Sequence, residues 1–103
     1  MPEQFDIDIK IMREKARNAI PLLKAVSNES RLLILCHLGQ GEMSVTELNE
    51  RFDLSQSALS QHLGVLRRDG LVNTRRESQT IYYSLASIEA ARLIEFLHGE
   101  FCA

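Results

Sequence analysis

The sequence predicts a mainly α-helical domain that carries one small β-hairpin. The chain has 103 residues, which is enough for one hydrophobic core. Apolar residues recur at the spacing of helices along most of the chain and switch to the alternating spacing of strands between residues 71 and 85. No repeat, flexible linker or low-complexity stretch divides the sequence, so residues 1–103 are expected to form a single domain.

The first predicted helix runs from about Ile7 to Ile20. Residues 12–19 are rich in helix formers and contain no helix breaker. Residues 5–11 alternate apolar and polar, and we interpret this alternation as a helix stripe that meets another surface. Pro21 is expected to end or kink the helix, because proline lacks the amide donor and clashes with the preceding turn.

A second helix is predicted to begin after Ser27 or Asn28, both good N-cap residues. The run of residues 32–36 is apolar nearly all round, as expected of a buried central helix. Gly39 and Gly41 are expected to end this helix, since glycine tolerates the backbone conformations found at helix ends.

Two capped helices come next. Ser44 and Glu47 have the spacing of a capping box, in which two otherwise unpaired backbone donors are satisfied. Ser55 can cap a further helix that runs to about Asp69, where Gly70 supplies a left-handed stop. The leucines of this helix have the i, i+4, i+7 spacing of a core-facing side: Leu59, Leu63 and Leu66.

A β-hairpin and a last helix complete the chain. Residues 71–76 and 80–85 have the composition of strands, and the three residues between them predict a hairpin. This connection lacks an Asn-Gly or Asp-Gly pair, so its turn type is left open. Ser87 is expected to cap the last helix. One side of that helix is apolar: Ile88, Ala91, Ile94 or Leu97, and Phe101.

A capped helix, a tight turn, a second capped helix and a hairpin together form a winged helix-turn-helix, whose second helix reads base edges in the major groove of DNA. The polar side of the helix after Ser55 offers hydroxyl and amide groups for this purpose. The candidate base-reading residues are Ser55, Gln56, Ser57, Ser60 and Gln61. The candidate phosphate or groove contacts are Arg67, Arg68, Arg75, Arg76 and Gln79. The alternative interpretation is a polar helix face that is only solvated.

The charge distribution bears on this choice. The net charge of −2 argues against nucleic acid, because phosphate binders are usually basic. Residues 55–76, however, carry four arginines and a single acidic residue, a net charge of +3, which leaves −5 on the rest of the chain. The sequence therefore predicts a basic DNA-binding surface on an acidic body.

Other classes of protein fit the sequence less well. Residues 1–10 lack a signal pattern and no apolar run approaches the roughly 18 residues of a membrane span, so we expect a cytoplasmic protein without a membrane partner. The chain has no Cys-x-x-Cys, no Gly-rich phosphate loop and no paired carboxylates, so we expect neither an enzyme nor a cofactor. A winged helix that binds another protein is a remaining alternative.

The two cysteines, Cys36 and Cys102, are not expected to form a permanent disulfide in a reducing compartment. They are core residues, metal ligands or a reversible redox switch, and their number does not choose among these.

Two segments resemble the ArsR/SmtB family of winged-helix repressors: LLKAVSNESRLLILCHL, and SVTELNERFDLSQSALSQHLGVLRRDGLVNTRRESQTIYYSL. The resemblance extends from about Leu22 to Cys102 and implies a homodimer that releases operator DNA when an inducer binds. Some relatives instead activate by displacing another repressor. The terminal helices form the interface in this family, which implies dimer contacts by Ile7, Ile11, Ile88, Ala91, Ile94, Leu97 and Phe101.

The inducer is the remaining question. Many members sense metals through a Cys-x-Cys before the base-reading helix or through Asp and His on the last helix, and residues 42–48 and 87–89 match neither pattern. The positions of Cys36 and Cys102 resemble a dithiol subgroup that responds to reactive sulfur or oxidants. This resemblance implies that the two thiols become linked, directly or through added sulfur, and that DNA affinity then falls.

A metal-sensing site is the alternative for the same cysteines. His98 and Cys102 have i, i+4 spacing on one helix face, and Cys36 with His37 would complete a set of ligands that zinc or copper(I) accepts.

Overall fold

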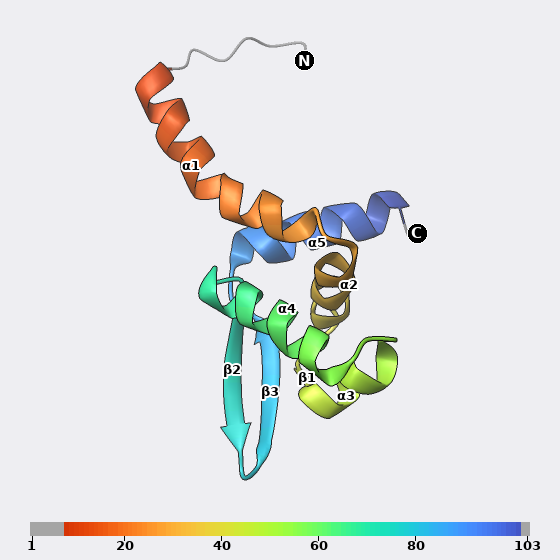
Figure 1. Ribbon diagram of the computed structural model, residues 1–103. Coiled ribbons are helices and arrows are strands. Elements are labelled where there is room, and N and C mark those ends of the chain that lie inside the picture. Colours follow the sequence, from red (N-terminus) through yellow and green to blue (C-terminus); the bar gives the residue numbers. More distant parts are fainter. Residues whose placement is uncertain (1–7, 102–103) are drawn as a thin grey trace.

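The computed structural model describes residues 8–101, which form helices packed around a small antiparallel sheet (Figure 1). The elements are α1 (Ile9–Val26), α2 (Glu29–Leu38), β1 (Met43–Ser44), α3 (Val45–Arg51), α4 (Gln56–Arg68), β2 (Val72–Glu77), β3 (Thr80–Leu85) and α5 (Ile88–Phe101). The predicted fold class is confirmed: the chain is mainly helical and its hairpin follows the helix-turn-helix formed by α3 and α4. None of the helices between residues 8 and 101 has the length and apolar character needed to cross a bilayer.

The sequence predicted that Pro21 would end or kink the first helix; the predicted end is wrong, because α1 continues to Val26. Contacts beyond the proline account for the extra turn: Ala25 is buried in the core, and Arg31 Nε donates a hydrogen bond to the Ala25 carbonyl at 3.2 Å. Burial and satisfied carbonyls at the helix end outweigh the bond that proline cannot donate. Asp8 caps the start of α1, and the predicted start at Ile7 lies outside the described residues.

The hydrophobic core lies between α2, α3, α4 and the sheet. Of the two predicted N-cap residues, Ser27 and Asn28, it is Asn28 that caps α2, and Gly39 stands at the C-terminal end of this helix. Gly70 has a φ of 74°, the left-handed conformation that its position after α4 predicted. The largest fully buried side chains include all three predicted α4 leucines: Ile34, Leu35, Leu48, Leu59, Leu63 and Leu66.

The sheet contains a strand that the sequence analysis missed. The predicted hairpin is present, with Glu77 opposite Thr80 and a two-residue turn in which Ser78 has a φ of 57°. Strand β1 pairs with the outer side of β3, so the order is β1-β3-β2. With two residues, β1 is too short to show an alternating pattern, and only its pairing with β3 defines it.

Helix α1 and the hairpin project from opposite ends of the body (Figure 1). The molecule is 51 Å long and its radius of gyration is 15.6 Å, whereas a compact domain of 100 residues has about 13 Å. The helix carries large apolar side chains that are exposed in the described part of the chain: Ile9, Ile11, Met12, Ile20 and Leu23. An extended helix with such a surface is typical of a chain that packs against a second molecule.

Candidate nucleic-acid interface and thiol pocket

The polar face of α4, which comprises Ser55, Gln56, Ser57, Ser60 and Gln61, is the candidate base-reading face. All five side chains are exposed, while the leucines on the other side of α4 are buried. Ser55 Oγ caps the helix by accepting a hydrogen bond from the Ala58 amide at 3.1 Å, and it lies 3.2 Å from Ser57 Oγ. The amide and hydroxyl groups of this face are therefore presented to solvent at the N-terminal end of α4.

Ser44 joins the helix-turn-helix to the hairpin, a role that sequence reasoning missed. As predicted, it forms a capping box with Glu47: the Glu47 amide donates to Ser44 Oγ at 3.1 Å, and the Ser44 amide donates to Glu47 Oε1 at 3.0 Å. The bond from the Ser44 amide, followed by the interaction with the Ser44 side chain, lowers the pKa of Glu47. Ser44 is also the last residue of β1, where it pairs with Tyr82 of β3. The start of α3 is thus fixed to the sheet.

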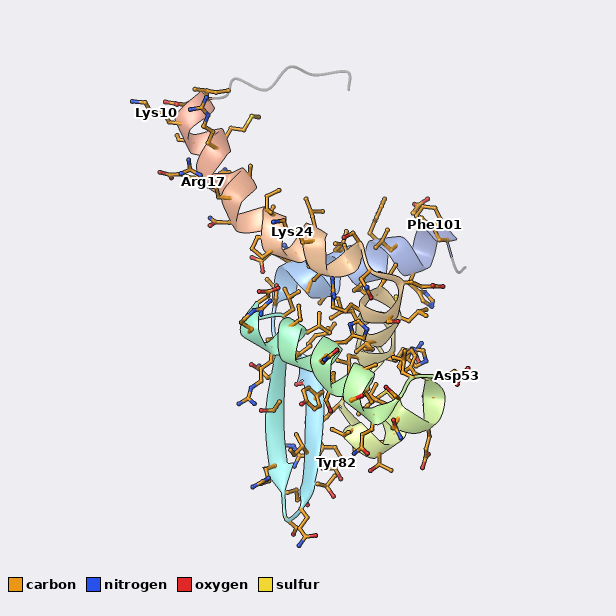
Figure 2. All side chains as sticks on the ribbon, viewed as in Figure 1. Lys10, Arg17, Lys24, Asp53, Tyr82 and Phe101 are labelled. Atoms are coloured by element: carbon orange, nitrogen blue, oxygen red, sulfur yellow. The ribbon has the colours of Figure 1, made fainter. Side chains whose placement is uncertain are left out.

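Arg75 of β2 forms ion pairs with two carboxylates. Its Nη2 lies 2.7 Å from Glu42 Oε1, its Nε donates to Glu42 Oε2 at 3.1 Å, and its Nη1 lies 2.8 Å from Glu77 Oε2. The guanidinium carbon lies 4.5 Å from the centre of the Tyr82 ring. Tyr82, labelled in Figure 2, belongs to β3, the strand between β2 and β1. The bond to Glu42, followed by that to Glu77, raises the pKa of Arg75, and Arg75 lowers the pKa of Glu42.

We call this group of Arg75, Glu42, Glu77 and Tyr82 the wing clamp. It changes the charge count made from residues 55–76, because two carboxylates outside that range neutralise one of the four arginines. Glu42 is 33 residues from Arg75 in the sequence, so no local pattern could have revealed the pair. The predicted contact of Arg75 with DNA stays a prediction, and it requires the clamp to open.

The other arginines predicted to contact DNA are less engaged in ion pairs than Arg75. Arg67 and Arg76 are exposed and form no ion pair with any residue from 8 to 101. Arg68 lies 3.7 Å from Asp69, a long contact on a side chain that is 74% exposed, and such surface pairs contribute little. Gln79 is exposed in the hairpin turn. Arg67 and Arg68 are the last residues of α4 and Arg76 lies in β2; we call these three exposed cations the basic border.

Cys36 is half-buried on α2 and lines a pocket of about 340 Å³ that we call the thiol pocket. Helix α5 supplies the opposite wall, and the pocket is lined by Cys36, Gly39, Gln40, Leu85, Ala91, Ile94, Glu95 and His98. Cys102, the predicted partner of Cys36, lies outside the described residues, and it follows His98 by four positions. The pairing of the two thiols therefore stays a prediction.

His37, the fourth residue of the metal alternative, does not line the thiol pocket. Its Nδ1 lies 2.9 Å from the Leu33 carbonyl oxygen, and its ring contacts the Phe52 ring edge-on at 4.8 Å between centres. Within residues 8–101, no three His, Cys, Asp or Glu side chains gather as a metal site. A metal site on these helices would therefore depend on Cys102.

The predicted dimer residues occupy different surroundings. Ile11, Ile88 and Phe101 are exposed, with Phe101 at 79%, and Ala91 and Leu97 are half-buried. Ile94 is only 4% exposed and belongs to the core of its own chain, where its Cγ2 would lie 3.2 Å from a Cβ added at Gly39. Ile7 lies outside the described residues. Phe96 and Leu33 are also large exposed apolar residues, which the sequence did not predict.

The sequence matches known regulators. Residues 28–74 match the bacterial regulatory protein, arsR family. The chain is 54% identical over 96 residues to the transcriptional activator HlyU of Vibrio cholerae, which covers 93% of this chain and 89% of that protein. It is 48% identical over 98 residues to the biofilm growth-associated repressor of Agrobacterium fabrum, which covers 95% of this chain and 84% of the repressor.

Solved structures agree with the sequence matches. Reduced HlyU from Vibrio cholerae superposes with a TM-score of 0.88 at 55% identity, covering 91% of this chain and 99% of that one. A homodimeric winged helix-turn-helix DNA-binding domain from Mycobacterium bovis superposes with a TM-score of 0.69 at 32% identity, covering 96% of this chain and 88% of that one. These relatives are regulators rather than enzymes, in agreement with the sequence prediction.

Proposed function

Because the chain belongs to the arsR family of bacterial regulatory proteins, we propose that it is a cytoplasmic, homodimeric transcriptional regulator that binds double-stranded operator DNA and is switched by its two thiols. The observation that carries the proposal is the division of α4 into a buried leucine side and an exposed base-reading face, accompanied by the basic border. Its relatives include an activator and a repressor, so the proposal concerns DNA binding and its control.

The base-reading face enters a major groove in this proposal. Gln56 and Gln61 can each bond adenine through two atoms, and the serine hydroxyls can bond several bases. Arg67, Arg68 and Arg76 then neutralise phosphates on either side of the groove. Each phosphate contact releases counterions, so affinity is expected to fall steeply as salt rises.

A homodimer supplies the second base-reading face. The apolar surface of α1 and the exposed side of α5 gain a partner if a second copy packs against them, and a related domain from Mycobacterium bovis is homodimeric. A two-fold dimer reads two half-sites one helical turn apart or a multiple of that distance. A small change in the spacing of the two α4 helices would then prevent simultaneous binding.

The thiol switch begins at Cys36 in our proposal. The Cys36 thiolate attacks the outer sulfur of a persulfide R–S–SH, a bond from Cys36 Sγ to that sulfur forms, and the thiolate RS⁻ leaves and takes up a proton. The Cys102 thiolate next attacks Cys36 Sγ, which forms a disulfide and releases HS⁻. If Cys102 also carries an added sulfur, the two persulfides condense to a trisulfide and release H₂S.

Such a link would act on DNA binding through α2. Cys36 follows Leu35, which is fully buried in the core that also holds the α4 leucines. Helix α5 carries the chain toward Cys102 and presents exposed apolar residues for the dimer. A covalent link from α2 to the end of α5 would therefore connect the core beneath α4 with the dimer surface.

The test selects a binding site from random-sequence duplexes with the reduced protein and measures affinity by fluorescence anisotropy before and after sodium tetrasulfide. We expect the affinity for DNA to fall. The intact mass should decrease by two hydrogen atoms for the link and increase by one sulfur atom for each sulfur inserted into it. Cys36→Ser and Cys102→Ser should keep the reduced-state affinity and lose the response. Gln61→Ala should weaken binding, whereas Glu50→Gln, an exposed change on α3, serves as the control.

The alternatives give different results in the same experiment. An unchanged mass together with an affinity altered by zinc would favour the metal site of Cys36, His98 and Cys102. Failure to select any duplex in either redox state would favour a winged helix that binds another protein.

A further inference from the structure

The thiol pocket has room for more than a sulfur atom. Its volume of about 340 Å³ exceeds the roughly 30 Å³ that one water occupies in the liquid, and it falls in the range of small-molecule sites. Leu85, Ala91 and Ile94 supply an apolar wall opposite α2. An organic substituent of a few carbon atoms can therefore lie beside Cys36.

The thiol pocket carries a negative charge from Glu95. Among residues 8–101, its polar lining consists of Gln40, Glu95 and His98 and includes no lysine or arginine. Glu95 is exposed on α5 and forms no ion pair within the part of the chain that the structure describes. Glu95 contributes the carboxylate among the lining residues that the structure describes. A cation beside it is stabilised, and an anion is repelled.

We propose that Glu95 makes the thiol pocket selective for persulfides whose organic substituent carries an ammonium group, over persulfides that carry a carboxylate. The inference rests on the proposed reaction of Cys36 with persulfides. In the selected reaction the substituent lies in the pocket, the Cys36 thiolate bonds to the outer sulfur, and the amine-bearing thiol leaves with the proton that Cys36 lost. Glu95 positions the substrate and takes no part in bond formation.

The experiment uses two persulfides of equal length and opposite charge, those of cysteamine and of 3-mercaptopropionate. The rate of the first step is measured in Cys102→Ser by intact mass, so that the second thiol cannot consume the product. The two probes differ in leaving-group reactivity. The deciding quantity is therefore the cysteamine-to-propionate rate ratio with Glu95 divided by the same ratio in Glu95→Gln, since this quotient cancels intrinsic reactivity.

We expect a quotient of about three to ten, the size of a partly screened interaction at a surface. Glu100→Gln, which removes an exposed carboxylate of α5 outside the pocket lining, should leave the rate ratio unchanged. A quotient of one, with both probes still modifying Cys36, would overturn the selectivity and leave the thiol switch standing. Failure of every persulfide to modify Cys36 would overturn the switch itself, and the selectivity with it.

Discussion

Arg75 and Arg76 are neighbours in β2, yet their side chains lie in different surroundings. Successive side chains of a strand point to opposite faces of the sheet. Arg75 and Arg76 therefore have different neighbours although they are adjacent in sequence. Arg75 is held by Glu42 and Glu77 over the Tyr82 ring, whereas Arg76 is exposed and without an ion pair among residues 8–101. Two identical side chains are therefore held differently: Arg75 is bound by two carboxylates, and the charge of Arg76 is exposed to solvent.

The two sides of α4 differ in a similar way. The leucine side supports the fold, and the base-reading face contributes nothing to the core. Because the buried leucines and the exposed glutamines of α4 lie on separate faces, substitutions of Leu63 and Gln61 should differ in their effect on stability. We therefore expect different effects from substitutions on the two faces of α4, and from substitutions of Arg75 and Arg76.

The largest effect is expected from Leu63→Ala, because Leu63 is 2% exposed and its truncation leaves a cavity in the core. The free energy of unfolding should fall by about 2–5 kcal/mol. Gln61→Ala on the exposed face should change it by less than about 0.5 kcal/mol. Urea denaturation monitored by circular dichroism measures both, and a loss of stability in Gln61→Ala equal to that in Leu63→Ala would contradict the separation of faces.

The next effect is expected from Ser44→Ala, which removes the cap of α3. The free energy of unfolding should fall by about 1 kcal/mol, the usual contribution of an N-cap hydroxyl. Ser55→Ala removes the cap of α4 and provides the matched comparison. Since Ser44 also belongs to β1, amide hydrogen exchange in β3 should increase in Ser44→Ala and stay unchanged in Ser55→Ala.

The arginine pair predicts a difference in the salt dependence of DNA binding. Arg76→Ala should lower the slope of log affinity against log salt by about 1, the value expected for one lost phosphate contact. Arg75→Ala should leave the slope unchanged, because its charge is already neutralised by carboxylates. Equal loss of slope in the two variants would mean that the wing clamp opens on DNA.

The smallest effect is expected from pH. The pKa values of Glu42 and Glu47 lie below their ordinary value of 4.5, because Arg75 and Ser44 respectively hydrogen-bond their carboxylates. A carboxyl group with a lowered pKa in the folded state stabilises the fold above the unfolded pKa, and this contribution is lost as pH falls through the folded pKa. The urea midpoint should therefore decrease below about pH 4.5, and less so in Glu42→Gln.

Local patterns predicted a large part of this fold. The caps at Asn28, Ser44 and Ser55 and the leucine spacing of α4 involve residues at most a few positions apart, so the sequence displays them directly. The end of α1 was predicted wrongly because a local rule about Pro21 met tertiary contacts at Ala25 and Arg31.

The base-reading face and the exposed arginines were likewise predictable from helix and strand periodicity. The wing clamp was not, since Glu42 and Arg75 approach each other only after β1 pairs with β3. The thiol pocket needs α2, α5 and the end of β3 together, so its lining is a property of the packed chain.

The sequence by itself determined the order of elements, their caps and the polar face of α4, because these depend on interactions within one or two helical turns. Only the tertiary structure decided that Arg75 is bound, that Ile94 is a core residue and that Glu95 shares a pocket with Cys36. The physical reason is distance along the chain. Contacts between residues far apart in sequence form only when several elements pack at once, and no local pattern records them.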